Sequence, residues 1–302
     1  MQTATLKNSS LSHPSDVSPG KRSVIAWFII LLALGSAGFL GEQAQNRWDL
    51  SLSVRYVLQA LIMSGIVLSG IGWMRTRVDK GKPAGIGVGT VPSALKFLGL
   101  GLGLFLGPFL LTLALTAVFG WADISLNTVE GFLPNFMLGV LTVFLFEALP
   151  EELVFRGYIF STLNVRFRKW KAALISIFSF VLLPVVLVQI QRYILGMEVS
   201  VGRTDHIELS YLITMLLFAS FIQYLRILTG SIWTGIGFHL VFVYINRMIG
   251  TEDYNLIQLS NISSEQPMQI VLICSLLLVF LFVILYPVLT KKKLGWREKW
   301  SA

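Results

Sequence analysis

The sequence predicts an all-α protein, a polytopic bundle of membrane-spanning helices with about eight spans. The 302 residues are 55% hydrophobic and only 13% charged, whereas a soluble domain is about 25% charged. The mean hydropathy is +0.73, and apolar runs long enough to cross a bilayer recur along the whole chain. These observations exclude a soluble globular domain, and they make the number of spans the measure of domain organisation.

The first 22 residues form a polar, Ser-rich segment that we expect to be a disordered cytoplasmic tail. The first apolar run, residues 24–40, follows Lys21-Arg22 and resembles a signal peptide. We expect an uncleaved span instead, because the rest of the chain is also membrane-embedded. The other spans are predicted at residues 54–74, 94–120, 132–147, 172–191, 209–228, 232–249 and 268–289.

The spans fall into three groups. Residues 23–120 are the N-terminal helices, residues 121–250 form a central core, and residues 251–302 hold the last helix and a basic cytoplasmic tail. Small residues allow helices to approach closely in membranes, so we expect such packing in the third span at Gly99, Gly101, Gly103 and Gly107. The single cysteine, Cys274, lies in an apolar run and is predicted to serve packing.

The charge of the loops predicts the topology. Basic residues gather at 21–22, 75–82, 166–171, 226 and 291–299, and the alternate loops carry the acidic residues. Under the positive-inside rule both termini are therefore cytoplasmic. The net charge of +8 is explained by these short loops, so we expect no nucleic-acid partner.

The most informative stretch is 147–156, where three carboxylates and an arginine follow an apolar run. An ionisable residue inside a membrane is a functional hypothesis by default. On a helix Glu147 would stack on Glu151, and Glu152 would stack on Arg156. The alternative is a solvated salt bridge at a helix end, which contributes little.

The topology places this stretch at the cytoplasmic end of the fourth span. Pro150 predicts a break or kink between the incoming helix and a new one. Residues 155–167 would then form a short helix along or just under the membrane surface.

A histidine approaches from the same side of the membrane. His239 lies in the seventh predicted span, roughly 10 Å from its cytoplasmic end. It could simply make a helix–helix hydrogen bond. With Glu151 and Glu152 at a similar depth, a carboxylate and an imidazole could instead polarise a water molecule for attack on a carbonyl.

The pattern Glu151-Glu152-x-x-x-Arg156, followed by Thr229-Gly230-Ser231-Ile232-Trp233 and His239, resembles the CPBP family. These are intramembrane glutamic endopeptidases related to the CAAX prenyl proteases (Rce1-like), and the family includes bacteriocin-immunity proteins. The resemblance covers residues 135–246, within the central core. It implies a helical fold with an active site that opens to the cytoplasmic side.

The resemblance also implies roles for four residues. Glu151 would be the general base that activates water. Glu152 and Arg156 would form a supporting pair, and His239 would stabilise the oxyanion.

Two positions depart from the family pattern. Where the family has a histidine four residues after Phe180, this chain has Pro184, and Val243 stands where Asn or Asp is common. Asn246 is a poor substitute because it lies about 10 Å further along the helix, and His206 is predicted on the external side. Loss of one oxyanion donor typically lowers a rate about 10²–10³-fold.

The leading hypothesis is a metal-independent intramembrane endopeptidase without a cofactor, acting on a peptide or membrane protein among lipids. A zinc site is not expected, because catalytic zinc needs about three protein ligands. The chain offers one histidine and two carboxylates here, and one of these carboxylates is predicted to pair with Arg156. The alternatives are a weak or inactive family member that binds a partner, as an immunity protein does, and a transporter or lipid-binding protein. The expected location is the plasma membrane of a bacterium.

Overall fold

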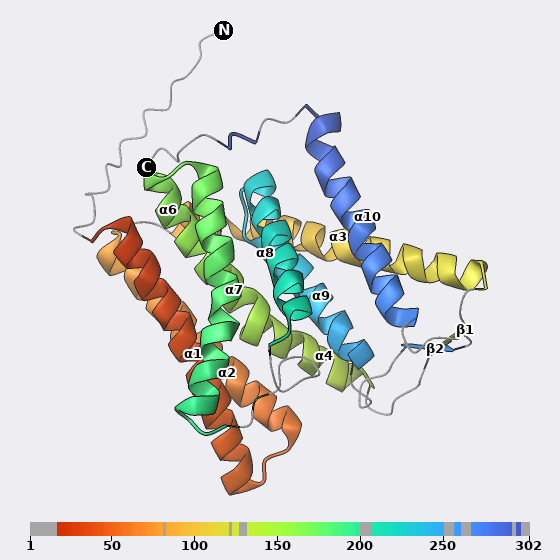
Figure 1. Cartoon of the computed structure of the whole chain (residues 1–302), viewed down its shortest axis with the longest axis horizontal. Coiled ribbons are helices and arrows are strands. Elements are labelled where there is room, and N and C mark those ends of the chain that lie inside the picture. The colour runs from red at the N-terminus through yellow and green to blue at the C-terminus, as the bar shows by residue number, and fades with distance from the viewer. Residues whose placement is uncertain are drawn as a thin grey trace.

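The computed structural model describes residues 17–80, 83–120, 123–126, 132–197, 199, 207–250, 257–260, 267–291 and 294–296. The first 16 residues of the predicted tail and His206 lie outside the described residues. The predicted all-α bundle is confirmed (Figure 1). Its helices are α1 (Pro19–Trp48), α2 (Leu52–Trp73), α3 (Val91–Val118), α4 (Phe132–Val143), α5 (Leu149–Glu152), α6 (Phe160–Arg166), α7 (Lys169–Tyr193), α8 (Leu209–Thr229), α9 (Trp233–Gly250) and α10 (Pro267–Leu289).

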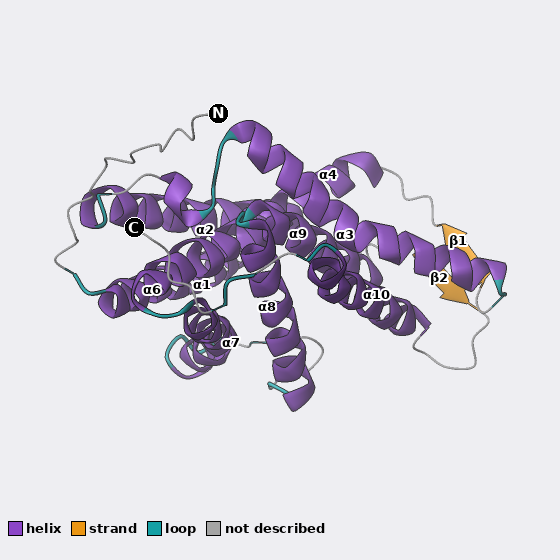
Figure 2. Ribbon diagram, turned by 90° about the horizontal axis from the view of Figure 1, so that it is seen from above, coloured by secondary structure: helices purple, strands orange, loops and turns teal. Residues whose placement is uncertain are grey.

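Shorter segments join these helices. Three are π-helical, η1 (Met74–Val78), η3 (Phe144–Ala148) and η4 (Leu153–Ile159), and η2 (Pro83–Ile86) is a 3₁₀ turn. Two short strands, β1 (Asp123–Leu126) and β2 (Ile257–Ser260), pair antiparallel with Asp123 opposite Ser260. The sequence did not predict this ribbon, which lies at the far end of α3 from the α1–α2 pair (Figure 2).

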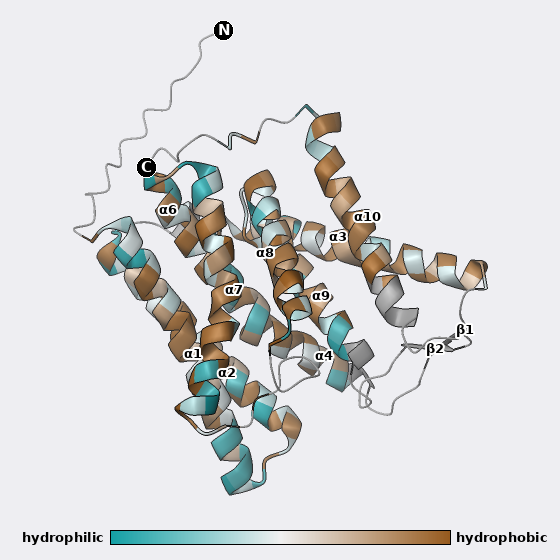
Figure 3. Cartoon of the chain, viewed as in Figure 1, coloured by the Kyte–Doolittle hydropathy of each residue, from teal (hydrophilic) through white to brown (hydrophobic). Residues whose placement is uncertain are grey.

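Five described helices are long and apolar enough to cross a membrane, namely α1, the helix 52–78, α3, α7 and α8. They correspond to five of the predicted spans, and the other three are also helical. Hydrophobic residues cover the long helices, and hydrophilic residues gather toward helix ends (Figure 3). The total of eight spans and the cytoplasmic placement of both termini stay predictions.

One glycine of the third predicted span allows a close helix crossing. α3 runs across the bundle and packs on α9 (Figure 1). A Cβ on Gly101 would lie 2.2 Å from the Thr234 carbonyl oxygen, and a Cβ on Gly237 would lie 2.4 Å from that of Leu98. The expected role is therefore confirmed for Gly101.

The same expectation is wrong for the three other glycines of that span. An added Cβ would meet nothing within 4 Å at Gly99, Gly103 or Gly107. Cys274, predicted to serve packing, is exposed on α10. In each case a helix of uniformly apolar composition gives no sign of which face meets the protein and which faces outward.

The helix that carries the carboxylates, called the carboxylate helix below, is continuous. α4, η3, α5, η4 and α6 join end to end from Phe132 to Arg166 with helical backbone at the junctions. Of the predicted break or kink at Pro150, the break is therefore wrong, whereas the π-helical turns on both sides of Pro150 are compatible with a kink. Proline lacks an N–H, and the π turn before it moves the backbone bonding to i+5, with the Leu149 N–H donating to the Phe144 carbonyl.

The carboxylate-bearing helix is longer than the fourth predicted span, because it continues about 20 Å beyond Glu152. Residues 153–164 are all buried within the protein. The end of the fourth span near Glu147, and the position of residues 155–167 along or just under the membrane surface, stay predictions.

Two of the segments predicted to be basic meet at a buried aspartate. Arg22 at the start of α1 and Arg75 of η1 both bind the buried Asp79, with N–O distances of 2.6 and 3.2 Å. The Tyr158 hydroxyl of η4 also donates to Asp79, at 3.1 Å. Asp79 thus ties the N-terminal helices to the helix that carries the carboxylates.

Gly101→Ala is expected to lower the free energy of unfolding by about 1–3 kcal/mol, because its Cβ would press on the backbone of α9. Gly99→Ala is the matched control. It meets open space and should be neutral or stabilise the helix by up to about 1 kcal/mol. Unfolding in detergent measures both, and equal stabilities of the two variants would contradict the close crossing.

Candidate active site

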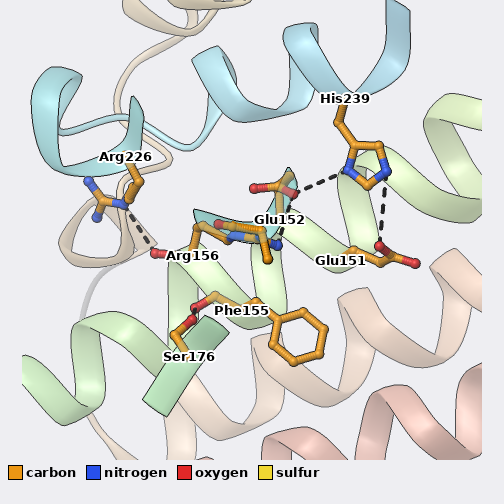
Figure 4. A network of polar contacts seen from close by, with 8 residues as sticks. Glu151, Glu152, Phe155, Arg156, Ser176, Arg226 and His239 are labelled. Atoms are coloured by element: carbon orange, nitrogen blue, oxygen red, sulfur yellow. Dashed lines mark hydrogen bonds and ion pairs between the residues drawn. The ribbon is translucent and has the colours of Figure 1, made fainter. Parts of the chain in front are cut away.

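Glu152 is the hub of a buried polar cluster (Figure 4). Its side chain is 0% exposed. One carboxylate oxygen, Oε1, lies 3.2 Å from Arg156 Nη1 and 3.2 Å from His239 Nδ1. The predicted Glu152–Arg156 stacking is confirmed, and the same oxygen also binds the histidine.

The other oxygen of Glu152 lies against α9. A Cβ on Gly235 would be 2.9 Å from Glu152 Oε2 and 2.8 Å from Ile222 Cγ2. Only glycine at position 235 leaves room for the carboxylate between α8 and α9. The shape of the backbone thus helps to fix where Glu152 lies.

His239 lies between two carboxylates. Its Nδ1 contacts Glu152, and its Nε2 is 4.0 Å from Glu151 Oε2. The Phe218 ring packs against the imidazole in a T-shaped arrangement, with the ring centroids 4.9 Å apart. The structure thus brings together Glu151, Glu152 and His239, as the sequence predicted, but His239 makes its shorter contact with Glu152.

The two carboxylates have different surroundings. Glu152 is fully enclosed, whereas the Glu151 side chain keeps 15% of its surface exposed. The 4.0 Å separation of Glu151 from His239 exceeds a hydrogen bond. Glu151 is therefore the more accessible of the two.

Arg156 is held on three sides. Besides Glu152, its guanidinium donates from Nη2 to the Ala219 carbonyl at 3.2 Å. It also lies 4.3 Å from the centre of the Phe180 ring, a cation–π contact. A buried guanidinium needs such partners, because an uncompensated buried charge is very costly.

Glu147 also makes a contact that the sequence did not predict. It pairs with Arg247 of α9. Side-chain exposures of 20% for Glu147 and 44% for Arg247 place this pair nearer the surface than the Glu152 pair.

The π-helical turns receive donors from neighbouring helices. Ser176 Oγ of α7 donates to the Phe155 carbonyl at 2.9 Å, and Arg226 Nε of α8 donates to the Arg156 carbonyl at 3.1 Å (Figure 4). In the first π turn, the Ser64 hydroxyl of α2 donates to the Leu145 carbonyl. The widened turns are thus tied to the rest of the bundle through their carbonyl groups.

Comparison with known proteins assigns this part of the chain. Residues 133–245 match the family model described as type II CAAX prenyl endopeptidase Rce1-like. This segment belongs to the Rce1-like family. The match confirms the resemblance predicted over residues 135–246, and it contains the whole polar cluster around Glu152. Comparisons with curated proteins and with solved structures gave no match.

The Rce1-like segment and the five apolar helices make the chain a multi-pass integral membrane protein. Membership of a CAAX-type protease family also indicates a peptide or membrane-protein substrate and a lipid environment. The specific roles of the clustered side chains are separate questions of chemistry.

The two positions that depart from the family pattern lie on the expected helices. Pro184 stands inside α7, one turn after the Phe180 that stacks on Arg156. Val243 lies in α9, one turn after His239. Asn246 donates back to the Phe242 carbonyl of its own helix at 2.7 Å. That Asn246 is a poor substitute for the missing residue stays a prediction.

Three charged residues in or near the Rce1-like segment are absent from the predicted site, namely Arg226, Arg247 and Asp79. Arg226 is one of the predicted basic loop residues, and Asp79 stands among basic neighbours. The rule that singled out Glu152 applies equally to Arg226, because a charge inside a predicted span is expensive. Applied consistently, it would have identified Arg226.

Among the residues that the structure describes, no group of three or more His, Cys, Asp or Glu side chains is arranged to hold a metal ion. The expected absence of a metal cofactor stays a prediction.

Glu152→Gln is expected to lower the free energy of unfolding by about 3–5 kcal/mol, because it removes the charge that compensates buried Arg156. Glu147→Gln is the matched control. It changes the more exposed pair with Arg247 and should cost at most about 1 kcal/mol. Unfolding of both variants, measured by one method, checks this. A Glu152→Gln protein as stable as the Glu147→Gln control would contradict the role of Glu152 in compensating the charge of Arg156.

Proposed function

We propose that the protein is an intramembrane endopeptidase in which Glu151 activates water for attack on a peptide bond. The observation that supports this most is the inequality of the two carboxylates around His239. Glu152 is enclosed and bound to Arg156, whereas Glu151 is partly exposed and lies 4.0 Å from His239 Nε2. The accessible carboxylate suits a general base, and the enclosed one suits a supporting role.

In this mechanism Glu151 takes a proton from the attacking water, and the water oxygen adds to the carbonyl carbon of the scissile bond. General-base help of this kind is typically worth about 10²–10⁴ in rate. The proton then passes to the leaving amine as the carbon–nitrogen bond breaks. Water supplies the oxygen and hydrogen atoms that the two products gain.

His239 would stabilise the negative charge that develops on the carbonyl oxygen. When the ring is protonated both nitrogens donate, so Nδ1 can serve Glu152 while Nε2 serves the oxyanion. Glu152 orients the imidazole through the 3.2 Å contact, and Arg156 balances the charge of Glu152. This assigns each of the four predicted residues a separate task.

A second candidate function is partner binding by a catalytically weak or inactive family member, as in an immunity protein. Pro184 and Val243 favour it, because neither side chain can form a hydrogen bond. Pro184 stands where the resemblance implies a histidine that helps the glutamate to hold the water, and Val243 stands where it implies Asn or Asp. Asn246 does not fill the place, since its amide binds its own helix.

Glu151→Gln is expected to abolish cleavage of membrane-proximal peptides by the purified protein, with a loss of at least about 10²-fold. The variant should fold normally, since Glu151 lies outside the Arg156 pair. Glu147→Gln, one turn away, is the control and should retain cleavage. Unchanged cleavage by Glu151→Gln would refute the assigned base. A wild-type protein that cleaves nothing, but whose cellular phenotype survives Glu151→Ala, would favour partner binding.

A zinc chelator such as 1,10-phenanthroline is expected to leave the cleavage rate unchanged, because water activation is assigned to a carboxylate. Thermolysin treated in parallel is the positive control, since its zinc carries the reaction. Inhibition that added zinc reverses would show that the mechanism is metal-dependent.

A further inference from the structure

We propose that Arg226 is a positioning residue that sets the distance between the helix of Glu151 and Glu152 and the helix of His239. Because this role deepens the proposed function and rests on it, the test below includes a readout that needs no catalysis. Arg226 is 2% exposed, lies near the end of α8 and contacts the backbone of Arg156.

The guanidinium of Arg226 binds both halves of the site. Nε donates to the Arg156 carbonyl at 3.1 Å, and Nη2 lies 3.4 Å from the Ser161 hydroxyl. Nη1 donates to the Gly230 carbonyl. Arg156 and Ser161 belong to the carboxylate helix, whereas Gly230 lies in the short loop that leads into α9.

The Gly230 contact reaches His239 through a short, well-defined segment. Gly230 caps α8 in the left-handed conformation, with φ 76°. α9 begins three residues later at Trp233 and carries His239 in its second turn. A shift of the Gly230 carbonyl would therefore move the start of α9.

The Arg156 contact acts on the π-helical turn of η4. A π turn holds one residue more than an α turn. Its conversion to α geometry would therefore rotate the helix after the turn relative to the helix before it by about 100°. Arg226 donates to the Arg156 carbonyl of this turn, and Ser176 donates to the Phe155 carbonyl. We infer that these donors favour the wide turn and so fix how Arg156 and Glu152 face His239.

The backbone around Arg226 is shaped to receive it. Gly87 has φ +88°, and a Cβ there would lie 2.7 Å from the guanidinium carbon. The Gly87 carbonyl accepts from the Ile232 N–H at 3.1 Å, and the Val88 carbonyl accepts from the Trp233 indole at 2.7 Å. The segment before α3 therefore covers Arg226 and binds the start of α9 as well.

Arg226→Lys tests this role, because lysine keeps the charge but loses the planar fork that reaches several carbonyls at once. Arg192→Lys is the matched control, since Arg192 of α7 also donates to a backbone carbonyl, that of Val199. Both are made with His13 and His206 replaced by Gln, which leaves His239 as the one histidine of the sequence. The ¹⁵N resonances of His239 in lipid nanodiscs are the readout.

We expect Arg226→Lys to shift both ring ¹⁵N resonances of His239 and Arg192→Lys to leave them unchanged. With cleavage measurable, kcat should fall at least about tenfold with little change in KM, since a misplacement near 1 Å can cost about 10². His239 resonances identical to those of the parent would overturn the role.

Should Arg226→Lys fail to fold, Ser161→Ala decides the matter, because it removes only the hydroxyl at Nη2. A smaller shift of the His239 resonances supports the role, and unchanged resonances overturn it. A protein without peptidase activity would refute the proposed function alone, because the resonances still report on the positioning.

Discussion

The buried ion pair between Glu152 and Arg156 is the constraint on which the rest of this structure depends. Both side chains are essentially without solvent exposure, and two charges inside a bundle are tolerated only when other groups complete their bonding. The imidazole of His239, the Ala219 carbonyl and the ring of Phe180 supply part of that bonding. Each comes from a different helix, so the pair determines how α7, α8 and α9 are placed around the carboxylate helix.

The carboxylate helix meets this demand by changing its winding instead of breaking. Its two π-helical turns flank the Pro150–Glu152 segment, and wide turns of this kind are frequent at functional sites. A break at Pro150 would have exposed carbonyl and N–H groups in the interior, where each unpaired group is costly. The wide turns keep the backbone bonded and offer carbonyls to Ser64, Ser176 and Arg226.

The spacing of residues along the chain predicted contacts within one helix. It did not predict which residues of one helix contact another helix. The Glu152–Arg156 pair follows from a separation of four residues, and composition was enough for the helical class. Gly101 and Gly99 look alike in sequence, yet only Gly101 faces α9, because an apolar helix in a membrane carries no polar face to orient it. The π turns could not be predicted either, since their extra donors come from residues far along the chain. For the same reason spacing predicted that Glu147 stacks on Glu151 but gave no sign of its ion pair with Arg247 of α9.

The small ribbon of β1 and β2 has a topological consequence. Its strands, at residues 123–126 and 257–260, stand just outside the two ends of the Rce1-like segment at 133–245. Their pairing therefore joins the chain before that segment to the chain after it. The neighbouring helices meet as well, because α10, which follows the segment, packs on α3, which precedes it. The helices on the two sides of the Rce1-like segment are thus packed together although the whole segment separates them in sequence.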